Sequence, residues 1–133
     1  MSRRLLAFIA LAIMSIFVIA ACDSGGSAAD PGAYTVSAEE AVQMIESDER
    51  TVIDVRSPAE YADAHIEGAV NIDVDGDFEA QIEELDPEEP YLVYCRSGNR
   101  SAQAAELMEE AGFQDVADAG GLADLARAGA PVE

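Results

Sequence analysis

Short apolar runs alternate with amphipathic stretches along most of the chain. Residues 51–55 and 91–94 are largely apolar and rich in β-branched or aromatic side chains. Such runs are typical of strands that are buried on both faces of a parallel sheet. Shorter runs predict strands at residues 34–36 and, after a turn, within residues 65–72. Residues 115–118 have the weakest strand pattern, and we expect them at an edge of the sheet.

Helix signals separate these strands. Ser37 and Ser57 each stand three residues before a glutamate, Glu40 or Glu60, which is the spacing of a capping box. Pro58 fills the first helical position after Ser57, where a proline fits well. Further amphipathic patterns predict helices over residues 77–85, 101–110 and 122–128. Strands that alternate with helices predict one α/β domain, with a mainly parallel central sheet of about five strands flanked by helices on both faces.

The first part of the chain has a different character. Arg3 and Arg4 precede residues 5–21, which are apolar apart from one serine. This run is shorter than the roughly 20 residues that a membrane-spanning helix usually needs, so it favours an export signal. Its end, Ile-Ala-Ala-Cys at residues 19–22, resembles the lipobox of bacterial lipoproteins. The resemblance implies cleavage before Cys22 and lipidation of its sulfur and new amine; an uncleaved anchor helix is the alternative.

These features predict three segments. Residues 1–21 form a lipoprotein signal peptide, residues 22–33 a lipidated Cys22 with a flexible tether, and residues 34–133 the folded domain. The mature protein is expected to face the periplasm or the cell exterior, held at the membrane by its lipid. Since lipidation uses Cys22, Cys95 remains as the only thiol, and no internal disulfide can form. A free thiol in an exported protein indicates reactivity, and a buried, inert cysteine is the alternative.

Acidic residues dominate the charge of the chain. Its formal net charge is −20 at pH 7, and it contains no lysine. That balance argues against nucleic-acid binding, because such binding depends on neutralising phosphates with cationic side chains. It also argues against peripheral binding to anionic lipid, so membrane attachment depends on the lipid anchor. Two of the five arginines beyond the signal peptide, Arg96 and Arg100, lie in one short loop and make it locally positive.

That loop is the hexapeptide Cys95-Arg96-Ser97-Gly98-Asn99-Arg100, which lies between the apolar run at residues 91–94 and an alanine-rich helical pattern. Cys95 is thus predicted at the carboxyl end of a parallel strand, where ligands bind in such sheets. Backbone N–H groups at the start of the following helix, together with the helix dipole, favour an anion at this point. The expected anion is the thiolate of Cys95 or a negatively charged substrate.

Three stretches together resemble a single-domain rhodanese. They comprise residues 53–61 continuing through 65–72, residues 94–101 with Ala104, Ala105 and Leu107, and finally Gly112-Phe113, Gly120-Gly121 and residues 128–133. The match spans nearly the whole mature domain. The resemblance implies the rhodanese α/β fold and a sulfurtransferase that works without a cofactor.

The resemblance also implies a two-step reaction. The Cys95 thiolate attacks the outer sulfur of thiosulfate, or of a related small anionic donor, and releases sulfite; cyanide or a thiol then takes the sulfur from the Cys95 persulfide. Arg96 and Arg100 would hold the donor's sulfonate, and the amides of residues 97–100 would cradle the outer sulfur. A lower thiol pKa increases the thiolate fraction but weakens the nucleophile, so donor binding and stabilisation of the departing sulfite must contribute more.

Alternative or structural roles apply to several polar residues. For Arg100 a salt bridge within the fold is the alternative, and for Ser97 and Asn99 the alternative is loop shaping alone. In the matched motif, His65 looks structural rather than like a catalytic partner of the cysteine. Arg56 and Glu60 stand four residues apart, and we expect them to pair across the helix cap.

We expect no metal site among the aspartates near Gly76, and two other positions depart from the usual family pattern. Asp73, Asp75 and Asp77 surround a glycine as in a calcium loop, but the glutamate that such a loop needs is missing, so we expect no metal there. Ala64 stands where the family often has glycine, and Leu125 where it often has tryptophan. These departures bear on acceptor specificity more than on the chemistry.

Other functions compete with sulfur transfer. Cysteine phosphatases and arsenate reductases have an anion-binding loop that resembles C-x5-R, with five residues between the cysteine and the arginine. Only four residues separate Cys95 from Arg100, so this loop is expected to be too small for a tetrahedral oxyanion. A membrane-tethered, non-catalytic binding module is the main alternative. Rhodanese-like domains with that fate commonly lose the cysteine, which this chain retains. A persulfide carrier for one envelope pathway would differ only in its acceptor.

Overall fold

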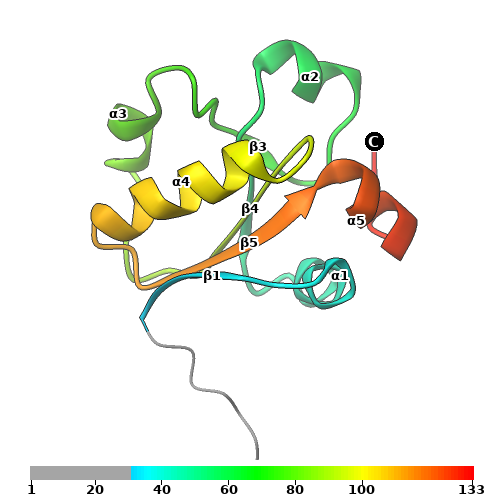
Figure 1. Ribbon diagram of the computed structural model, residues 1–133, viewed down its shortest axis with the longest axis horizontal. Helices are drawn as coiled ribbons and strands as arrows, with labels where there is room; N and C mark the ends of the chain where they lie inside the picture. The colour runs from blue at the N-terminus through cyan, green and yellow to red at the C-terminus, as the bar shows by residue number, and fades with distance from the viewer. Residues whose placement is uncertain (1–30) are drawn as a thin grey trace, which may run out of the picture.

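Within residues 31–133, a single five-stranded sheet forms the centre of the domain (Figure 1). The computed structural model describes these residues, so the predicted signal peptide, Cys22 and residues 22–30 of the tether lie outside the described part. The strands are β1 (Gly32–Thr35), β2 (Thr51–Asp54), β3 (Val70–Asn71), β4 (Tyr91–Cys95) and β5 (Asp115–Gly121). Their order is β1-β5-β4-β2-β3, and every neighbouring pair is parallel. The predicted α/β domain is confirmed, and its sheet is parallel throughout.

The prediction that residues 115–118 lie at an edge of the sheet is wrong. β5 pairs with β1 on one side and with β4 on the other. Asp118 accepts a hydrogen bond from Gly120 N at 3.0 Å, and Asp115 pairs with Arg50 at 2.7 Å. Because these acidic groups have partners nearby, β5 can lie inside the sheet without the long apolar run that usually marks an inner strand.

The described residues contain five helices: α1 (Ala38–Ser47), α2 (Pro58–Asp63), α3 (Phe78–Ile82), α4 (Asn99–Glu110) and α5 (Leu122–Ala128). As predicted, helices lie on both faces of the sheet, α3 and α4 on one and α1 and α5 on the other (Figure 1). Both predicted capping boxes are present, at the starts of α1 and α2. α3 is shorter than the predicted helix over residues 77–85, although Phe78 and Ile82 face the core as expected. None of the helices in residues 31–133 has the length and apolarity that a membrane crossing requires.

Strand β4 is buried on both faces. Tyr91, Val93 and Cys95 belong to the apolar cluster on the α3–α4 face, whereas Leu92 and Tyr94 belong to the cluster on the α1–α5 face. This alternation follows from the two-residue period of a strand. Each large apolar side chain that is fully buried in this way contributes about 2 kcal/mol to folding. Cys95 therefore points to the face covered by α4, the helix that its own loop leads into.

Candidate active site

Cys95 ends strand β4, where the sequence predicts it. The chain turns through residues 96–98 and enters α4 with Gly98 as the N-cap, at φ 100°. That positive φ is costly for a residue with a side chain, which explains the glycine. The backbone N–H of Gly98 donates a hydrogen bond to Cys95 Sγ at 2.9 Å. At least one loop amide thus points at the sulfur.

Ser101 is a second contact of the sulfur that sequence analysis did not single out. It is fully buried, its Oγ lies 3.5 Å from Cys95 Sγ, and its hydroxyl donates to Gly98 O at 3.0 Å. Ser101 therefore links the sulfur to the turn above it. The sequence contained one indication of this contact: Ser101 is a polar residue on the side of α4 that is otherwise occupied by alanines and faces the core.

The surroundings lower the pKa of the Cys95 thiol below its ordinary value. Burial is the largest single influence and raises this pKa, because it disfavours the charged thiolate. A hydrogen bond from the Ser101 hydroxyl, which must then leave Gly98 O, and hydrogen bonds from the amides of Ser101, Gly98 and Ser97 lower it, and together they outweigh burial. The thiolate is thus stabilised by the loop and by the start of α4.

We expect the Cys95 thiolate to form at lower pH than the thiolate of a free cysteine. The difference in ultraviolet thiolate absorbance between the full chain and its Cys95→Ser variant, followed against pH, should have a midpoint pKa below the ordinary value of about 8.5. Because the folded-state pKa is the lower one, the thiolate stabilises the fold above the unfolded-state pKa. That stabilisation is lost as the pH falls through the folded-state pKa. A midpoint at or above about 8.5 would contradict a lowered pKa of the Cys95 thiol.

Cys95 is buried, with an exposed fraction of 0%. The sequence favours a reactive thiol over a buried, inert one, and the structure shows the buried position. Arg96, Ser97 and Asn99 are exposed in the loop beyond the sulfur. In this arrangement the sulfur is covered from solvent.

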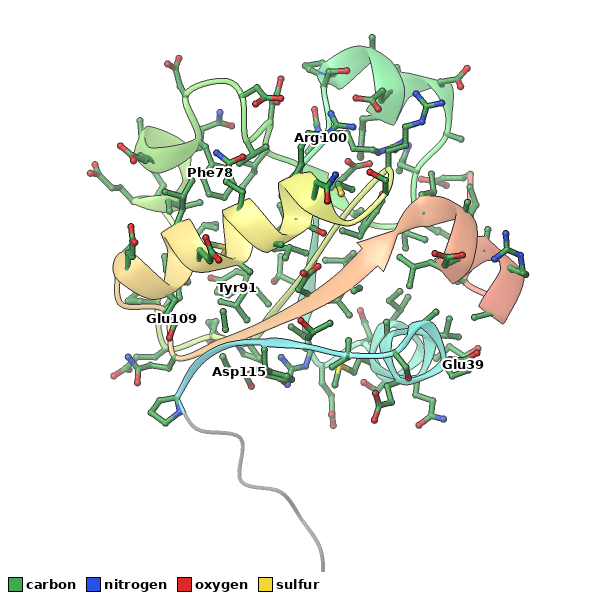
Figure 2. All side chains as sticks on the ribbon, viewed as in Figure 1. Glu39, Phe78, Tyr91, Arg100, Glu109 and Asp115 are labelled. Atoms are coloured by element: carbon green, nitrogen blue, oxygen red, sulfur yellow. The ribbon has the colours of Figure 1, made fainter. Side chains whose placement is uncertain are left out.

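Arg100 forms a bidentate ion pair with Glu60 of α2. Its two terminal nitrogens lie 2.8 Å from the two carboxylate oxygens, and Figure 2 shows Arg100 at the end of α4 that is nearest to α2. The hydrogen bond from Arg100 is the main reason that the pKa of Glu60 is lowered to about 2. The sequence allowed a salt bridge within the fold as the alternative to donor binding by Arg100, and the structure shows that salt bridge. It ties the start of α4 to α2 and compensates one of the loop's two positive charges.

The expected pairing of Arg56 with Glu60 is wrong. Arg56 instead binds Asp54, with 2.9 Å between Nε and Oδ1 and 2.6 Å between Nη2 and Oδ2. Asp54 has an exposed fraction of 0%, and a buried carboxylate requires hydrogen-bonded partners. Tyr94 supplies another, because its hydroxyl donates to Asp54 Oδ2 at 2.7 Å. The burial of Asp54 thus decides the partner of Arg56 and leaves Glu60 for a different cation.

Arg96 is the one arginine of residues 31–133 that forms no ion pair. The other four each lie within 2.8 Å of a carboxylate oxygen: Arg50, Arg56, Arg100 and Arg127. The side chain of Arg96 is exposed and directly follows the cysteine. The positive loop predicted from the sequence therefore offers one uncompensated guanidinium, that of Arg96.

Gly121 lies opposite Cys95 in the sheet and packs against the loop. A Cβ atom at Gly121 would lie 2.6 Å from Arg96 O and 3.3 Å from Ser97 Cα. The first distance is too short for any side chain to be accepted unless the backbone shifts. Gly120 and Gly121 are the last two residues of β5. The missing side chain of Gly121 thus helps to set the position of the loop.

His65 makes structural contacts. Its Nδ1 lies 2.7 Å from Tyr61 O and its Nε2 lies 3.0 Å from Glu133 Oε1, while its ring stacks on Tyr61 at a centroid distance of 3.8 Å. In residues 31–133 neither ring nitrogen is bonded to Cys95. These contacts fit the structural role that the motif implies.

The three aspartates near Gly76 form an ordinary turn, in which Asp73 Oδ1 accepts a hydrogen bond from Asp75 N at 3.0 Å. Within the described part of the chain, no group of three or more His, Cys, Asp or Glu side chains is arranged to hold a metal ion.

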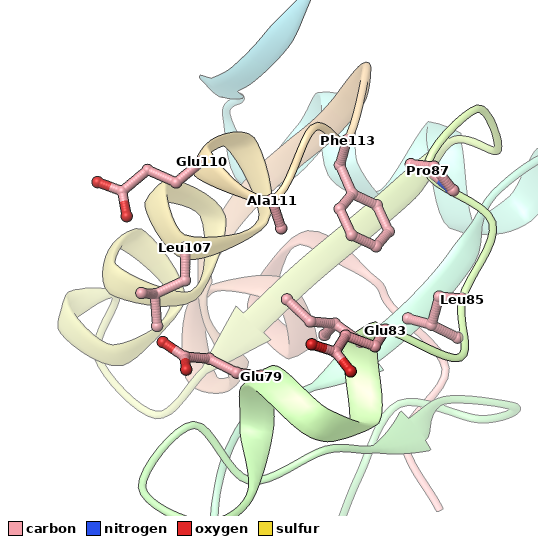
Figure 3. Close-up of a pocket in the computed structure, with 9 residues that line it drawn as sticks. Glu79, Glu83, Leu85, Pro87, Leu107, Glu110, Ala111 and Phe113 are labelled. Carbon is pink, nitrogen blue, oxygen red and sulfur yellow. The ribbon is translucent and has the colours of Figure 1, made fainter.

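The hollow shown in Figure 3 lies away from the cysteine. Ile82 of α3, Leu107 of α4 and Phe113 line it, with glutamates at its rim. Leu107 follows Asn99 by eight residues, which corresponds to about 12 Å along a helix. This hollow is therefore at the far end of α4 and does not belong to the candidate active site.

Comparisons with known proteins agree with this geometry. The family model for the rhodanese-like domain matches residues 37–127. The chain is 40% identical over 76 residues to the thiosulfate sulfurtransferase PspE of Escherichia coli (strain K12), which is 56% of this chain and 72% of that protein. It is 36% identical over 97 residues to the thiosulfate sulfurtransferase GlpE of Pseudomonas putida (strain KT2440), which is 71% of this chain and 86% of that protein. The solution structure of the rhodanese-like domain of the Alr3790 protein from Anabaena sp. has a TM-score of 0.68 at 28% identity and covers 79% of this chain and 80% of that one. The chain belongs to the rhodanese-like family.

Proposed function

We propose that this protein is a sulfurtransferase that carries a sulfane sulfur on Cys95, from thiosulfate or a related small anion to cyanide or a thiol. The observation that carries the proposal is the hydrogen bond of 2.9 Å from Gly98 N–H to Cys95 Sγ. A backbone donor aimed at the sulfur stabilises the negative charge of the thiolate, which attacks in the first step and is restored in the second. Relatives named thiosulfate sulfurtransferases, at 36% and 40% identity, support thiosulfate as the donor.

The reaction has two displacements on sulfur. In the first, the Cys95 thiolate forms a bond to the outer sulfur of thiosulfate, and the sulfur–sulfur bond of the donor breaks, so that its electron pair leaves with sulfite. In the second, cyanide or a thiolate attacks the outer sulfur of the persulfide, and the Cys95 thiolate is restored. The Gly98 amide stabilises the Cys95 thiolate before the first step and as the leaving group of the second, and the Arg96 guanidinium attracts the incoming dianion.

Access to the sulfur requires a local movement of the loop. Cys95 is fully buried, whereas Arg96, Ser97 and Asn99 in front of it are exposed. Exposed loop residues can move without breaking the core, because they bury little apolar area. We propose that displacement of Arg96 and Ser97 admits the donor, while β4 and α4, which begins at Asn99, keep their places.

A direct assay tests the proposal. The full chain is incubated with thiosulfate and cyanide, and the release of sulfite and the appearance of thiocyanate are measured together. We expect one thiocyanate for each sulfite, since a single sulfur passes through Cys95. Sulfite without thiocyanate would indicate a different fate for the sulfur, and neither product would leave the activity without support.

The burial of Cys95 also favours a second candidate function, a tethered binding module without catalysis. In that case the loop would stay closed and serve as a rigid surface for a partner protein. The two functions differ in one observable property, because the binding module forms no persulfide when treated with thiosulfate.

Replacing Arg96 by alanine should weaken donor binding more than it slows the chemical step. A charge-assisted contact contributes about 1.5 kcal/mol or more, so we expect KM for thiosulfate to rise about tenfold, with a small change in kcat. Steady-state kinetics at low ionic strength measure both. The matched control is Arg127→Ala, which removes an exposed arginine that is paired with Asp124 at 2.6 Å. An equal effect of both substitutions would mean that only the net charge matters.

We also propose that the chain is exported and held at a membrane through lipid on Cys22, which lies outside the described residues. The lipobox-like end of the apolar run supports this proposal. In the native host, Cys22→Ser should prevent lipidation. The protein should then appear in the soluble extracytoplasmic fraction or accumulate as the uncleaved precursor. Metabolic labelling with a radioactive fatty acid provides the second measurement. Persistent labelling of the Cys22→Ser variant would contradict the proposal.

A further inference from the structure

We propose that the groove between α2, the active-site loop and α5 is the docking site for the sulfur acceptor. We infer that this acceptor is a cysteine in a protein segment with apolar and basic neighbouring residues. The inference rests on the proposed sulfurtransferase function and adds the class of the acceptor. The groove has a volume of about 440 Å³ and is lined by Glu60, Asp63, Arg96, Leu122, Ala126 and Val132, among others.

The position of the groove connects it to the sulfur. Arg96 directly follows Cys95 and lines the groove. On the opposite wall, α5 begins at Leu122, one residue after Gly121, whose strand partner is Cys95. A molecule in the groove thus contacts the loop that covers the thiol, so it is close to the persulfide when that loop opens.

The floor of the groove is apolar and accessible. Val132 has an exposed fraction of 41% and is one of two large hydrophobic residues of the described chain that are exposed to this degree. Ala126 is also exposed, and Leu122 is half-buried. Covering such side chains removes apolar area from water at about 25 cal/mol per Å². A partner with apolar side chains therefore gains affinity here, whereas cyanide does not.

Charge selects among the apolar partners. Four charged side chains line the groove: Arg56, Glu60, Asp63 and Arg96. Arg56 is paired with Asp54 and Glu60 with Arg100, whereas in residues 31–133 Asp63 forms no ion pair or side-chain hydrogen bond. The net charge of the whole chain is −20, so an anionic thiol is repelled over a distance of about 10 Å at moderate ionic strength. A segment with lysine or arginine beside its cysteine is attracted by the same field. The single uncompensated cation, Arg96, remains available for the sulfonate of the donor.

Two peptides serve as probes. Both contain one cysteine and the same leucines, and they differ only in that lysines or glutamates flank the cysteine. The full chain is first loaded with sulfur from thiosulfate and freed of excess donor, and the loss of its persulfide to each peptide is then followed by mass spectrometry. We expect the lysine peptide to be at least about tenfold faster at low salt, and the difference to shrink at high salt.

Two variants locate the effect in the groove. Ala126→Trp should fill the groove and slow transfer to the lysine peptide about tenfold, while transfer to cyanide stays unchanged. Ala80→Trp, on an exposed alanine of α3 on the other face of the sheet, is the matched control and should change neither rate. Asp63→Lys should reduce the preference for the lysine peptide without adding bulk. Unchanged transfer to cyanide shows that each variant is folded.

The outcomes separate this inference from the function on which it rests. If the persulfide forms and reacts with cyanide, but the peptides are equal or Ala126→Trp has no effect, the docking site is wrong and the sulfurtransferase function stands. A faster glutamate peptide would also overturn the proposed acceptor class. If no persulfide forms, both proposals fail together.

Discussion

Replacing Cys95 by serine should abolish sulfur transfer. A serine hydroxyl is a weak nucleophile at neutral pH and cannot form a persulfide, so we expect the rate of thiocyanate formation to fall by at least about 1000-fold. Treated with thiosulfate, the unchanged full chain should gain one sulfur atom, which is lost when cyanide is added. Mass spectrometry of the intact protein and of its peptides measures the gain and locates it.

The second cysteine of the chain provides the control. In peptide maps of the thiosulfate-treated chain without substitutions, the added sulfur should lie on the peptide that contains Cys95. The Cys22→Ser variant should gain the same sulfur atom. The Cys95→Ser variant should keep the thermal stability of the parent to within about 1 kcal/mol, because the substitution is small. A sulfur adduct that survives in Cys95→Ser, or none in the parent, would contradict a Cys95 persulfide and favour the binding module.

Replacing Gly121 by alanine should lower kcat about 100-fold, although no atom of Gly121 takes part in the reaction. The new Cβ would lie 2.6 Å from Arg96 O, so the loop backbone must shift. A displacement of about 1 Å in a reacting group can cost about 100-fold in rate. The shift should also weaken the hydrogen bond of 2.9 Å from Gly98 N–H to Cys95 Sγ. We therefore expect the pKa of the Cys95 thiol to rise towards its ordinary value.

The pH profile distinguishes positioning from general destabilisation. If Gly121→Ala acted only by unfolding part of the protein, the rate would fall without a change in the midpoint of thiolate formation. Gly76→Ala is the matched control, since a Cβ at Gly76 would make only ordinary contacts, the nearest at 3.5 Å from Asp73 O. It should leave both the rate and the midpoint unchanged. A fully active Gly121→Ala enzyme would show that the loop tolerates the shift.

Most of the fold could be predicted because its signals are local. The apolar run at residues 91–94 indicates a strand buried on both faces, and the Ser57–Glu60 spacing indicates a helix start. Strand order is different, because it depends on which segments pair across the domain. Residues 115–118 looked like an edge strand for that reason, while Asp115 is paired with Arg50, 65 residues away, which the local pattern does not reveal.

The candidate site was predictable in its composition and less so in its geometry. The hexapeptide identified Cys95, its two arginines and a turn at Gly98, because residue type and spacing express these features directly. The fit of Gly121 against Arg96 O is different, since it joins the ends of two strands that are separated by a whole helix. Nothing in the local pattern around Gly121 indicated that its missing side chain makes room for the loop.

By itself, the sequence determined the alternation of strands and helices, the helix caps, the acidic charge, and the placing of one cysteine between a strand and a helix. These properties depend on neighbours within a few residues, where backbone hydrogen bonding and side-chain period are decisive. Only the tertiary structure decided that β5 lies inside the sheet, that Cys95 is buried, and that Glu60 takes Arg100, 40 residues away, as its partner. Such choices follow from the competition among buried polar groups for partners, and that competition exists only once distant segments are packed together.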